Sequence, residues 1–154
     1  MTEVDIRIEP VSSLVAGKLI AALDADLQRR EPDQPLYGID VTTFETDGGV
    51  FAVGYIGGEA AVCGAIQPCG DAAEIKRMFV VPGFRGQGVG REMLRFLEQE
   101  AVRRGYRKGV LETGTGQPEA ISLYRSQGWR PTPPFGPYVS NPTSTCFEKR
   151  LDAG

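Results

Sequence analysis

Hydrophobic residues alternate with charged ones along residues 4–9, and this period of two predicts a half-buried strand. A period near 3.6 follows and predicts a helix with Ser12 or Ser13 as its N-cap. The apolar face of this helix carries Val15, Leu19, Leu23 and Leu27. The helix should end at Glu31, because a residue that precedes a proline, here Pro32, is pushed out of helical geometry.

The rest of the chain is read in the same way, with Gly57-Gly58 as the tight turn of a hairpin. In chain order the later elements are predicted as a loop over 31–49, strands over 49–56, 60–67 and 73–81, a helix over 88–104, a strand over 108–113, a short helix from Pro118 to Gly128 and a last strand over 144–151. Strands and helices in this order predict an α/β fold, with a mixed central sheet and helices on both faces.

Length and charge exclude several classes of protein. The chain has 154 residues, 41% of them hydrophobic, so we expect one globular domain over residues 1–154. A net charge of −3 argues against a nucleic-acid partner, which would need a basic stripe. No apolar run is long enough to span a membrane, and the N-terminus lacks the pattern of a signal peptide. We therefore expect a cytoplasmic protein without a membrane partner.

The cysteines, and the absence of histidine, limit which metal sites, general bases and nucleophiles the chain can have. Cys63, Cys69 and Cys146 lack zinc-like spacing, and we expect reduced thiols and no bound metal. The chain contains no histidine, which removes the commonest general base and the Ser-His and Cys-His nucleophiles. An acyl-cysteine intermediate is disfavoured for the same reason, because no histidine could activate the thiol. Cys63 and Cys146 are expected to be core residues.

The segment from Glu74 to Gly90 is the most informative part of the chain. It predicts a strand that ends in a glycine-rich turn and opens a helix, so that several backbone N–H groups point outward and can hold phosphate. The absence of side chains at Gly86, Gly88 and Gly90 would let the backbone approach the anion closely. Arg85 would add a charge-assisted hydrogen bond, and the helix N-terminus adds about half a positive charge.

Two other nucleotide-binding motifs do not fit this turn. A Walker A loop ends in Gly-Lys followed by Ser or Thr, whereas Gly88 is followed by Val89-Gly90. A dinucleotide-binding Gly-x-Gly-x-x-Gly would need glycine at position 91, which is Arg91. A plain turn without a ligand is the simpler interpretation of any glycine cluster, and only the surrounding residues argue against it here.

The glycine pattern of residues 85–90, after a strand that carries a carboxylate, resembles the acyl-CoA pyrophosphate loop of the GNAT (N-acetyltransferase) superfamily. Residues 117–129 are similar to a later segment of that family, in which a tyrosine, here Tyr124, lies near the coenzyme sulfur. Residues 111–113 resemble the family's fifth strand. These matches cover about residues 73–130 and occur in the family's order.

The resemblance implies a GNAT-type mixed sheet that is mostly antiparallel, and acetyl-CoA as co-substrate. A splay between the strands that end near Val81 and Thr113 would admit the pantetheine arm. Gln117 stands where the family has asparagine, and Trp129 where it has phenylalanine. The implied cofactor-binding residues are Phe79, Val80, Val81, Arg85, Gly86, Gln87, Gly88, Val89, Gly90, Arg91, Gln117 and Tyr124.

Acyl transfer to an amine needs a base more than an acid. An alkylamine with a pKa near ~10.4 is protonated at neutral pH, whereas a thiol with a pKa of roughly 8.5 leaves with little help. Glu74 resembles the carboxylate that some GNAT members use as base, although a surface carboxylate paired with a cation is the simpler interpretation. Glu112, in an otherwise apolar strand, is the second candidate. Tyr124 can donate a proton to the leaving thiolate.

Alternation along the strand before the turn divides its side chains into two faces. One predicted face carries Glu74, Lys76, Met78 and Val80, and the other Ile75, Arg77, Phe79 and Val81. The backbone N–H of Phe79 or Val81 would polarise the acyl carbonyl.

The combined prediction is an acyl-CoA-dependent N-acetyltransferase that moves an acetyl group from acetyl-CoA to a primary amine of a small molecule by direct transfer. Two alternatives stay open: a protein or peptide N-acetyltransferase, and a non-catalytic acyl-CoA-binding sensor module. The expected partner is the amine acceptor, and a homodimer is a possible assembly. The acceptor pocket is expected in segments 31–49 and 132–142, from Tyr37, Asp40, Phe44, Glu45, Phe135 and Tyr138.

Overall fold

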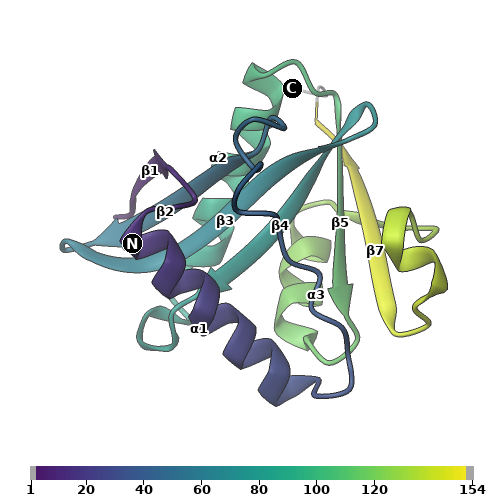
Figure 1. The fold of residues 1–154 in the computed structure, drawn as a ribbon, viewed down its shortest axis with the longest axis horizontal. Coiled ribbons are helices and arrows are strands. Elements are labelled where there is room, and N and C mark those ends of the chain that lie inside the picture. The colour runs from purple at the N-terminus through teal and green to yellow at the C-terminus, as the bar shows by residue number, and fades with distance from the viewer. Residues whose placement is uncertain (1–2, 152–154) are drawn as a thin grey trace.

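The computed structural model describes residues 3–151, and the strands in this part of the chain form one mixed sheet. Seven strands lie in the order β1-β2-β3-β4-β5-β7-β6, and β4 with β5 is the parallel pair among antiparallel neighbours (Figure 1). The elements are β1 (Asp5–Glu9), α1 (Leu14–Arg30), β2 (Val50–Ile56), β3 (Glu59–Cys69), β4 (Ala72–Val80), α2 (Val89–Arg103), β5 (Lys108–Gly114), α3 (Pro118–Ser126), β6 (Arg130–Thr132) and β7 (Ser144–Arg150).

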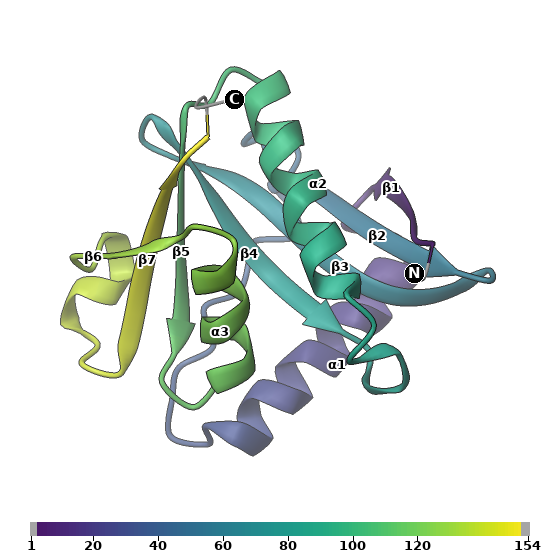
Figure 2. The ribbon, with the colours of Figure 1, turned by 180° about the vertical axis from the view of Figure 1, so that it is seen from behind.

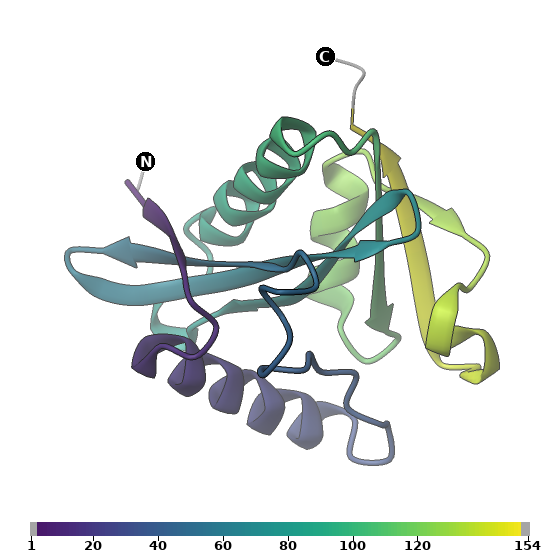
Figure 3. The same cartoon turned by 45° about the horizontal axis from the view of Figure 1, so that its top comes forward.

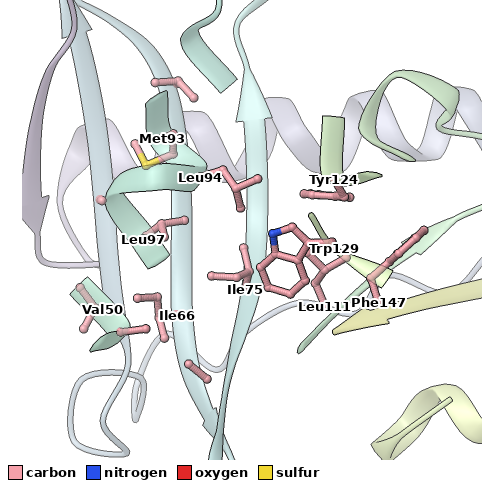
Figure 4. Close-up of a cluster of buried hydrophobic side chains, with 14 of the residues drawn as sticks. Val50, Ile66, Ile75, Met93, Leu94, Leu97, Leu111, Tyr124, Trp129 and Phe147 are labelled. Atoms are coloured by element: carbon pink, nitrogen blue, oxygen red, sulfur yellow. The ribbon is translucent and has the colours of Figure 1, made fainter. Parts of the chain in front are cut away.

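The helices cover both faces of the sheet, as predicted. Figure 3 shows α1 on one face and α2 with α3 on the other, and Figure 2 gives the view from the α2 side. Each face buries its own apolar cluster, which excludes water and stabilises the packing. The cluster under α2 includes Ile75, Met93, Leu97, Leu111 and Trp129 (Figure 4). The cluster under α1 includes Leu19, Leu23, Phe51, Val53 and Phe79.

The first helix begins and ends where the sequence predicts. Ser13 is its N-cap, and the Ser13 Oγ accepts a hydrogen bond of 3.1 Å from the N–H of Ala16. Glu31 is the C-cap, directly before Pro32. Strand β6 was not predicted. It has only three residues and contains a proline, which an edge strand tolerates because one side of its backbone faces away from the ladder.

Strand β4 contains a β-bulge that the sequence analysis did not predict. Cys63 lies opposite Phe79 and Ala65 lies opposite Lys76, so two steps on β3 match three on β4. Arg77, inside this interval, has a φ of 57°, in the left-handed region that few non-glycine residues adopt.

The bulge moves side chains to different faces from those predicted by strict alternation. Ile75 and Met78, predicted on opposite faces, both pack in the cluster under α2. Lys76 and Arg77, also predicted on opposite faces, both point to the α1 side, where Lys76 Nζ donates to the carbonyl of Gly38 and Arg77 pairs with Asp24 of α1. The predicted alternation was therefore wrong beyond Lys76, because an extra residue reverses the pleat.

Strands β4 and β5 pair over only a short stretch, and this creates an opening in the sheet. Ala73 lies opposite Gly109, and the last pair is Ile75 with Leu111. Beyond that pair the two strands diverge, as Figure 1 shows. The expected splay is thus present, and it begins at Lys76 on one strand and at Glu112 on the other.

Candidate active site

The glycine turn borders a groove of about 370 Å³ that also contacts the ends of α1 and β4 and the start of α3. We call it the cofactor groove. The predicted cofactor-binding residues that line it are Phe79, Val80, Arg85, Gly86, Gly88, Val89, Gly90, Arg91, Gln117 and Tyr124. Val81 and Gln87 belong to the same segment without lining the groove.

The turn presents bare backbone to the groove. Gly86 and Gly88 have φ angles of 80° and 78°, which favour glycine, and a Cβ at either position would meet no protein atom within 4 Å. Gly88 is the N-cap of α2 and offers no side chain to the first N–H groups of the helix. These N–H groups and the helix dipole fit an anion such as a diphosphate.

Arginine side chains lie at the rim of the groove. Arg85 Nε donates to the carbonyl of Val80 at 3.0 Å, and its guanidinium lies 3.8 Å from Asp26 of α1. Arg30, in the last turn of α1, reaches across to Glu119 of α3 with a contact of 2.9 Å. Arg30 also pairs with Asp26 at 3.3 Å, and Arg91 is a third arginine in the lining. Three arginines therefore face the carboxylates of Asp26 and Glu119, and the excess of positive charge suits an anionic ligand.

The backbone donor that faces the groove is not one of the two predicted. The N–H of Val81 donates to the carbonyl of Ala61 at 2.8 Å, so it is already used within the sheet. Because hydrogen bonding alternates along a strand, the N–H of Phe79 also points to β3. Val80 faces the other way, since its carbonyl accepts from Arg85. The N–H of Val80, and not that of Phe79 or Val81, is the one directed to the splay.

A second compartment, which we call the polar cavity, has a volume of about 100 Å³. It lies between the end of α1, the 34–37 segment, the splayed part of β4 and β5, and residues 138–141. Leu23, Met78, Gln117 and Tyr124 line both this cavity and the cofactor groove. The two compartments therefore meet at Tyr124.

Tyr124 is held by packing. Its side chain is 6% exposed, and its ring lies 6.4 Å from that of Trp129 and 6.3 Å from that of Phe147, as Figure 4 shows. Burial, and to a lesser extent the charge of Glu112, raises the pKa of Tyr124, so the phenol stays protonated. Tyr124 lines both compartments, which places the phenol beside any ligand that spans them.

The two candidate bases both line the polar cavity. Glu74 is 5% exposed and accepts hydrogen bonds from Tyr138 Oη at 2.6 Å and Gln67 Nε2 at 3.3 Å. It is not the surface carboxylate of the simpler interpretation. Glu112 accepts a hydrogen bond of 2.6 Å from Ser144 Oγ. Burial, and then the charge of Glu31, raises the pKa of Glu112, which makes it a stronger base than an ordinary carboxylate.

Of the six residues predicted for the acceptor pocket, only two line the polar cavity. Tyr37 and Tyr138 line the polar cavity, with ring centroids 4.8 Å apart. Phe44 is instead a core residue, because the absence of a side chain at Gly49 lets its ring pack there. Asp40 and Glu45 serve local structure, since Asp40 accepts a hydrogen bond from the N–H of Thr42 and Glu45 accepts one from the N–H of Val11. Phe135 packs on Tyr138 and lines a different hollow.

Several residues that line the polar cavity were missed, among them Glu31, Gln34, Lys76, Thr113 and Asn141. Glu31 caps the end of α1, Gln34 and Asn141 lie in loops, and Lys76 and Thr113 lie in strands. Each is a common polar residue, and no motif singles it out. The signal that could have found Glu31 is its position at the end of a helix that packs on the splay. That packing is a property of the fold and not of the local sequence.

The cysteines lie away from both compartments. Cys63 and Cys146 are buried, as predicted, and Cys69 is half-buried. Burial raises the pKa of Cys63 to about 12, and its Sγ donates to the carbonyl of Arg77. None of the three lines the cofactor groove or the polar cavity. Across residues 3–151 no cluster of three metal-ligating side chains occurs, and no helix there has the length and apolarity to cross a membrane.

Comparison with known proteins gives the same family as the sequence motifs. The acetyltransferase (GNAT) family model matches residues 18–129. An IAA acetyltransferase from Azospirillum brasilense is 38% identical over 147 residues, which cover 94% of this chain and 95% of the relative.

Solved structures support the same family. One protein, assigned as an acyl-CoA N-acyltransferase from Klebsiella pneumoniae, is 32% identical with a TM-score of 0.81, over 96% of this chain and 97% of that one. A GNAT acetyltransferase from Elizabethkingia anophelis with acetyl-CoA bound shares the fold, with a TM-score of 0.70 at 19% identity over 96% and 97% of the two chains. The chain therefore belongs to the GNAT acetyltransferase family and is an N-acetyltransferase.

Proposed function

We propose that this enzyme transfers the acetyl group of acetyl-CoA directly to a primary amine of a small molecule. The observation that carries the proposal is the meeting of two compartments at one buried phenol. The cofactor groove and the polar cavity share Tyr124, so a thioester in one and an amine in the other would react beside its hydroxyl. A sensor module without catalysis would have no need for this arrangement.

The groove fits the chemical parts of acetyl-CoA in order. The N–H groups of the glycine turn and of α2 would hold the diphosphate, with Arg85 and Arg91 close by. The pantetheine arm would enter the splay between β4 and β5 like an added strand. The N–H of Val80 would then polarise the thioester carbonyl as negative charge develops on its oxygen. A bound acetyl-CoA in the Elizabethkingia anophelis relative supports this choice of co-substrate.

In the proposed reaction the amine nitrogen attacks the thioester carbonyl, a C–N bond forms, and the C–S bond breaks. The amine must first lose a proton, and Glu74 is the first candidate to accept it, fixed in place by Tyr138. Glu112 is the second candidate, with its raised pKa. Tyr124 gives its proton to the departing thiolate of CoA.

Direct transfer is favoured over an acyl-enzyme. A covalent intermediate needs an activated nucleophile at the junction of the two compartments. No cysteine lines either compartment, and the chain has no histidine to activate one.

A small acceptor is favoured over a peptide because two segments close over the polar cavity. Asn141 Nδ2 donates to Gln34 Oε1 at 3.1 Å and to Tyr37 Oη at 3.0 Å. The rings of Tyr37 and Tyr138 add an edge-to-face contact. An extended peptide would have to break this bridge between the 34–37 segment and residues 138–141, whereas a small amine would fit beneath it.

The test is a screen for CoA release with acetyl-CoA and a panel of amines, amino acids, peptides and IAA, beside calorimetric titration of acetyl-CoA. We expect acetyl-CoA binding and turnover on small amines. Binding without turnover on any acceptor would instead identify a sensor module. Turnover confined to peptides would identify a protein N-acetyltransferase and contradict the proposal.

A further inference from the structure

The polar cavity is lined by more carboxylates than cations. Glu31, Glu74 and Glu112 all line it, and none forms a salt bridge with a lysine or arginine in the described part of the chain. Their hydrogen-bond donors are uncharged: the N–H of Gly116 and the side chains of Gln117, Tyr138, Gln67 and Ser144. Carboxylates taken out of water normally gain a cationic partner, since desolvation penalises their charge.

The cations that line the cavity do not balance this charge. Arg77 is already paired with Asp24, so it contributes no net charge to the cavity. Lys76 directs its Nζ to the carbonyl of Gly38 at 3.0 Å and forms no salt bridge with a described carboxylate. Three carboxylates thus face one uncompensated ammonium group. The cavity has an excess of negative charge that a cationic ligand would neutralise.

The fold provides a specific place for the third carboxylate, Glu31. A Cβ at Gly114 would lie 2.2 Å from Glu31 Oε1, and a Cβ at Gly116 would lie 2.8 Å from its Cγ, so the two glycines leave the space that this side chain fills. The carboxylate then accepts from the N–H of Gly116 at 3.1 Å and from Gln117 Nε2 at 3.2 Å. Glu31 is therefore held at the cavity wall.

A buried hydroxyl without a partner also points to a ligand. Thr113 lines the cavity with 5% of its surface exposed, and its Oγ1 is buried without a hydrogen bond to any described residue. A buried polar atom left unpaired carries a desolvation cost, which a bound hydrogen-bond donor or acceptor would offset. The ring edges of Tyr37 and Tyr138 enclose the same space.

We infer that the acceptor is a cationic amine that bears no acid group, that diamines are the favoured class, and that Glu31 is a specificity-determining residue for the second positive charge. This rests on the proposed function. One carboxylate, Glu74 or Glu112, is needed at the reacting amine. The others remain to attract a second ammonium group, and they repel the carboxylate of an amino acid or another organic acid.

Two matched series of acceptors test the inference. The first is butylamine, 1,4-diaminobutane and 4-aminobutanoate. The second is benzylamine, 4-(aminomethyl)benzylamine and 4-(aminomethyl)benzoate. Within each series the reacting amine is kept while the far end is neutral, positive or negative. We expect kcat/KM for CoA release to be roughly tenfold higher for the diamine than for the monoamine, and lowest for the acid, because charges a few ångströms apart interact strongly in a partly buried site.

Three variants separate the roles of individual charges. Glu31→Gln keeps the shape of the side chain and should remove most of the preference for the diamine over the monoamine. Lys76→Met should change the preference in the opposite direction and raise it. Glu59→Gln removes a carboxylate from the exposed start of β3 and should leave the preference unchanged. Opposite effects of the first two variants could not come from a general loss of stability.

The outcomes distinguish this inference from the proposed function. Wild-type turnover that favours the acid, or that is equal across a series, would overturn the inference while the acetyltransferase assignment to small amines stands. A preference for diamines that survives in Glu31→Gln would overturn the role of Glu31. A wild-type enzyme that binds acetyl-CoA and acetylates none of the six amines would overturn the small-amine function, and this inference with it.

Discussion

At the scale of single residues, Tyr124 occupies the position on which the proposed chemistry depends, because it lines both compartments and its phenol stays protonated. Tyr124→Phe removes one hydroxyl and keeps the ring that packs on Trp129. We expect kcat to fall roughly 10–10³-fold, since the thiolate would leave without a proton donor. Acetyl-CoA affinity, measured by calorimetry, should change little.

Tyr106→Phe is the matched control, since Tyr106 packs against the core and lines neither compartment. Its kcat should equal that of the wild type. An unchanged rate in Tyr124→Phe would remove this residue from the mechanism.

The sequence predicted the single residues that belong to a motif and missed those that do not. Two short segments, residues 85–90 and 117–129, match the family. They contribute Arg85, the turn glycines and Tyr124, and all of these line the cofactor groove. The walls of the polar cavity come instead from α1, the 34–37 segment, β5 and residues 138–141. Their meeting depends on the tertiary fold. An aromatic residue such as Phe44 therefore could not be separated from Tyr37 by its sequence context, although one is core and the other lines the cavity.

At the scale of elements, a substitution in the turn before α2 can test whether the diphosphate binds there. Gly88→Val would place a β-branched side chain where a Cβ now meets open space, and it would strain a residue with a φ of 78°. We expect acetyl-CoA affinity to fall by at least about 100-fold in calorimetry, because the backbone N–H groups could no longer reach the phosphates.

Gly83→Val serves as control for the turn, since its Cβ also meets open space but its backbone is not in the left-handed region. It should bind acetyl-CoA as the wild type does. Circular dichroism would establish that both variants fold. Wild-type affinity in a folded Gly88→Val protein would show that the diphosphate binds elsewhere.

The bulge in β4 is held by an ion pair to α1, and this gives a prediction about stability. Arg77 adopts an unfavourable φ and its side chain is buried, with Asp24 as its charged partner. Asp24→Ala should lower the free energy of unfolding by about 1–3 kcal/mol, because a buried guanidinium would lose its counter-ion. Urea denaturation measures this change. Asp5→Ala, which breaks the exposed pair with Arg7, should leave the free energy of unfolding nearly unchanged.

The elements themselves were largely predictable, and the exceptions have physical causes. The caps and the hydrophobic period fixed α1, where Ser13 and Glu31 stand at its two ends. The bulge at Arg77 escaped prediction because alternation assumes an unbroken ladder, and no glycine marks the inserted residue. Strand β6 escaped because three residues with a proline carry no periodic signal, and pairing with β7 alone makes them a strand.

At the scale of the whole molecule, the cofactor groove and the polar cavity share one wall, and in the proposed mechanism each holds one of the two substrates. Direct transfer then requires a ternary complex, and double-reciprocal plots of initial rates should give lines that intersect. Parallel lines would instead indicate an acyl-enzyme. So would an acetylated cysteine, detected by mass spectrometry after the enzyme is incubated with acetyl-CoA in the absence of an acceptor.

Thiol labelling completes the same test. Cys63 is buried with a pKa raised to about 12, and Cys146 is buried as well, so iodoacetamide at pH 8 should modify the half-buried Cys69 first. Because Cys69 lies outside both compartments, we expect the labelled enzyme and the Cys69→Ala variant to keep wild-type kcat/KM for both substrates. A loss of activity in step with labelling would place a thiol in the reaction and contradict direct transfer. Retained activity would support direct transfer of the acetyl group from acetyl-CoA to the amine beside Tyr124.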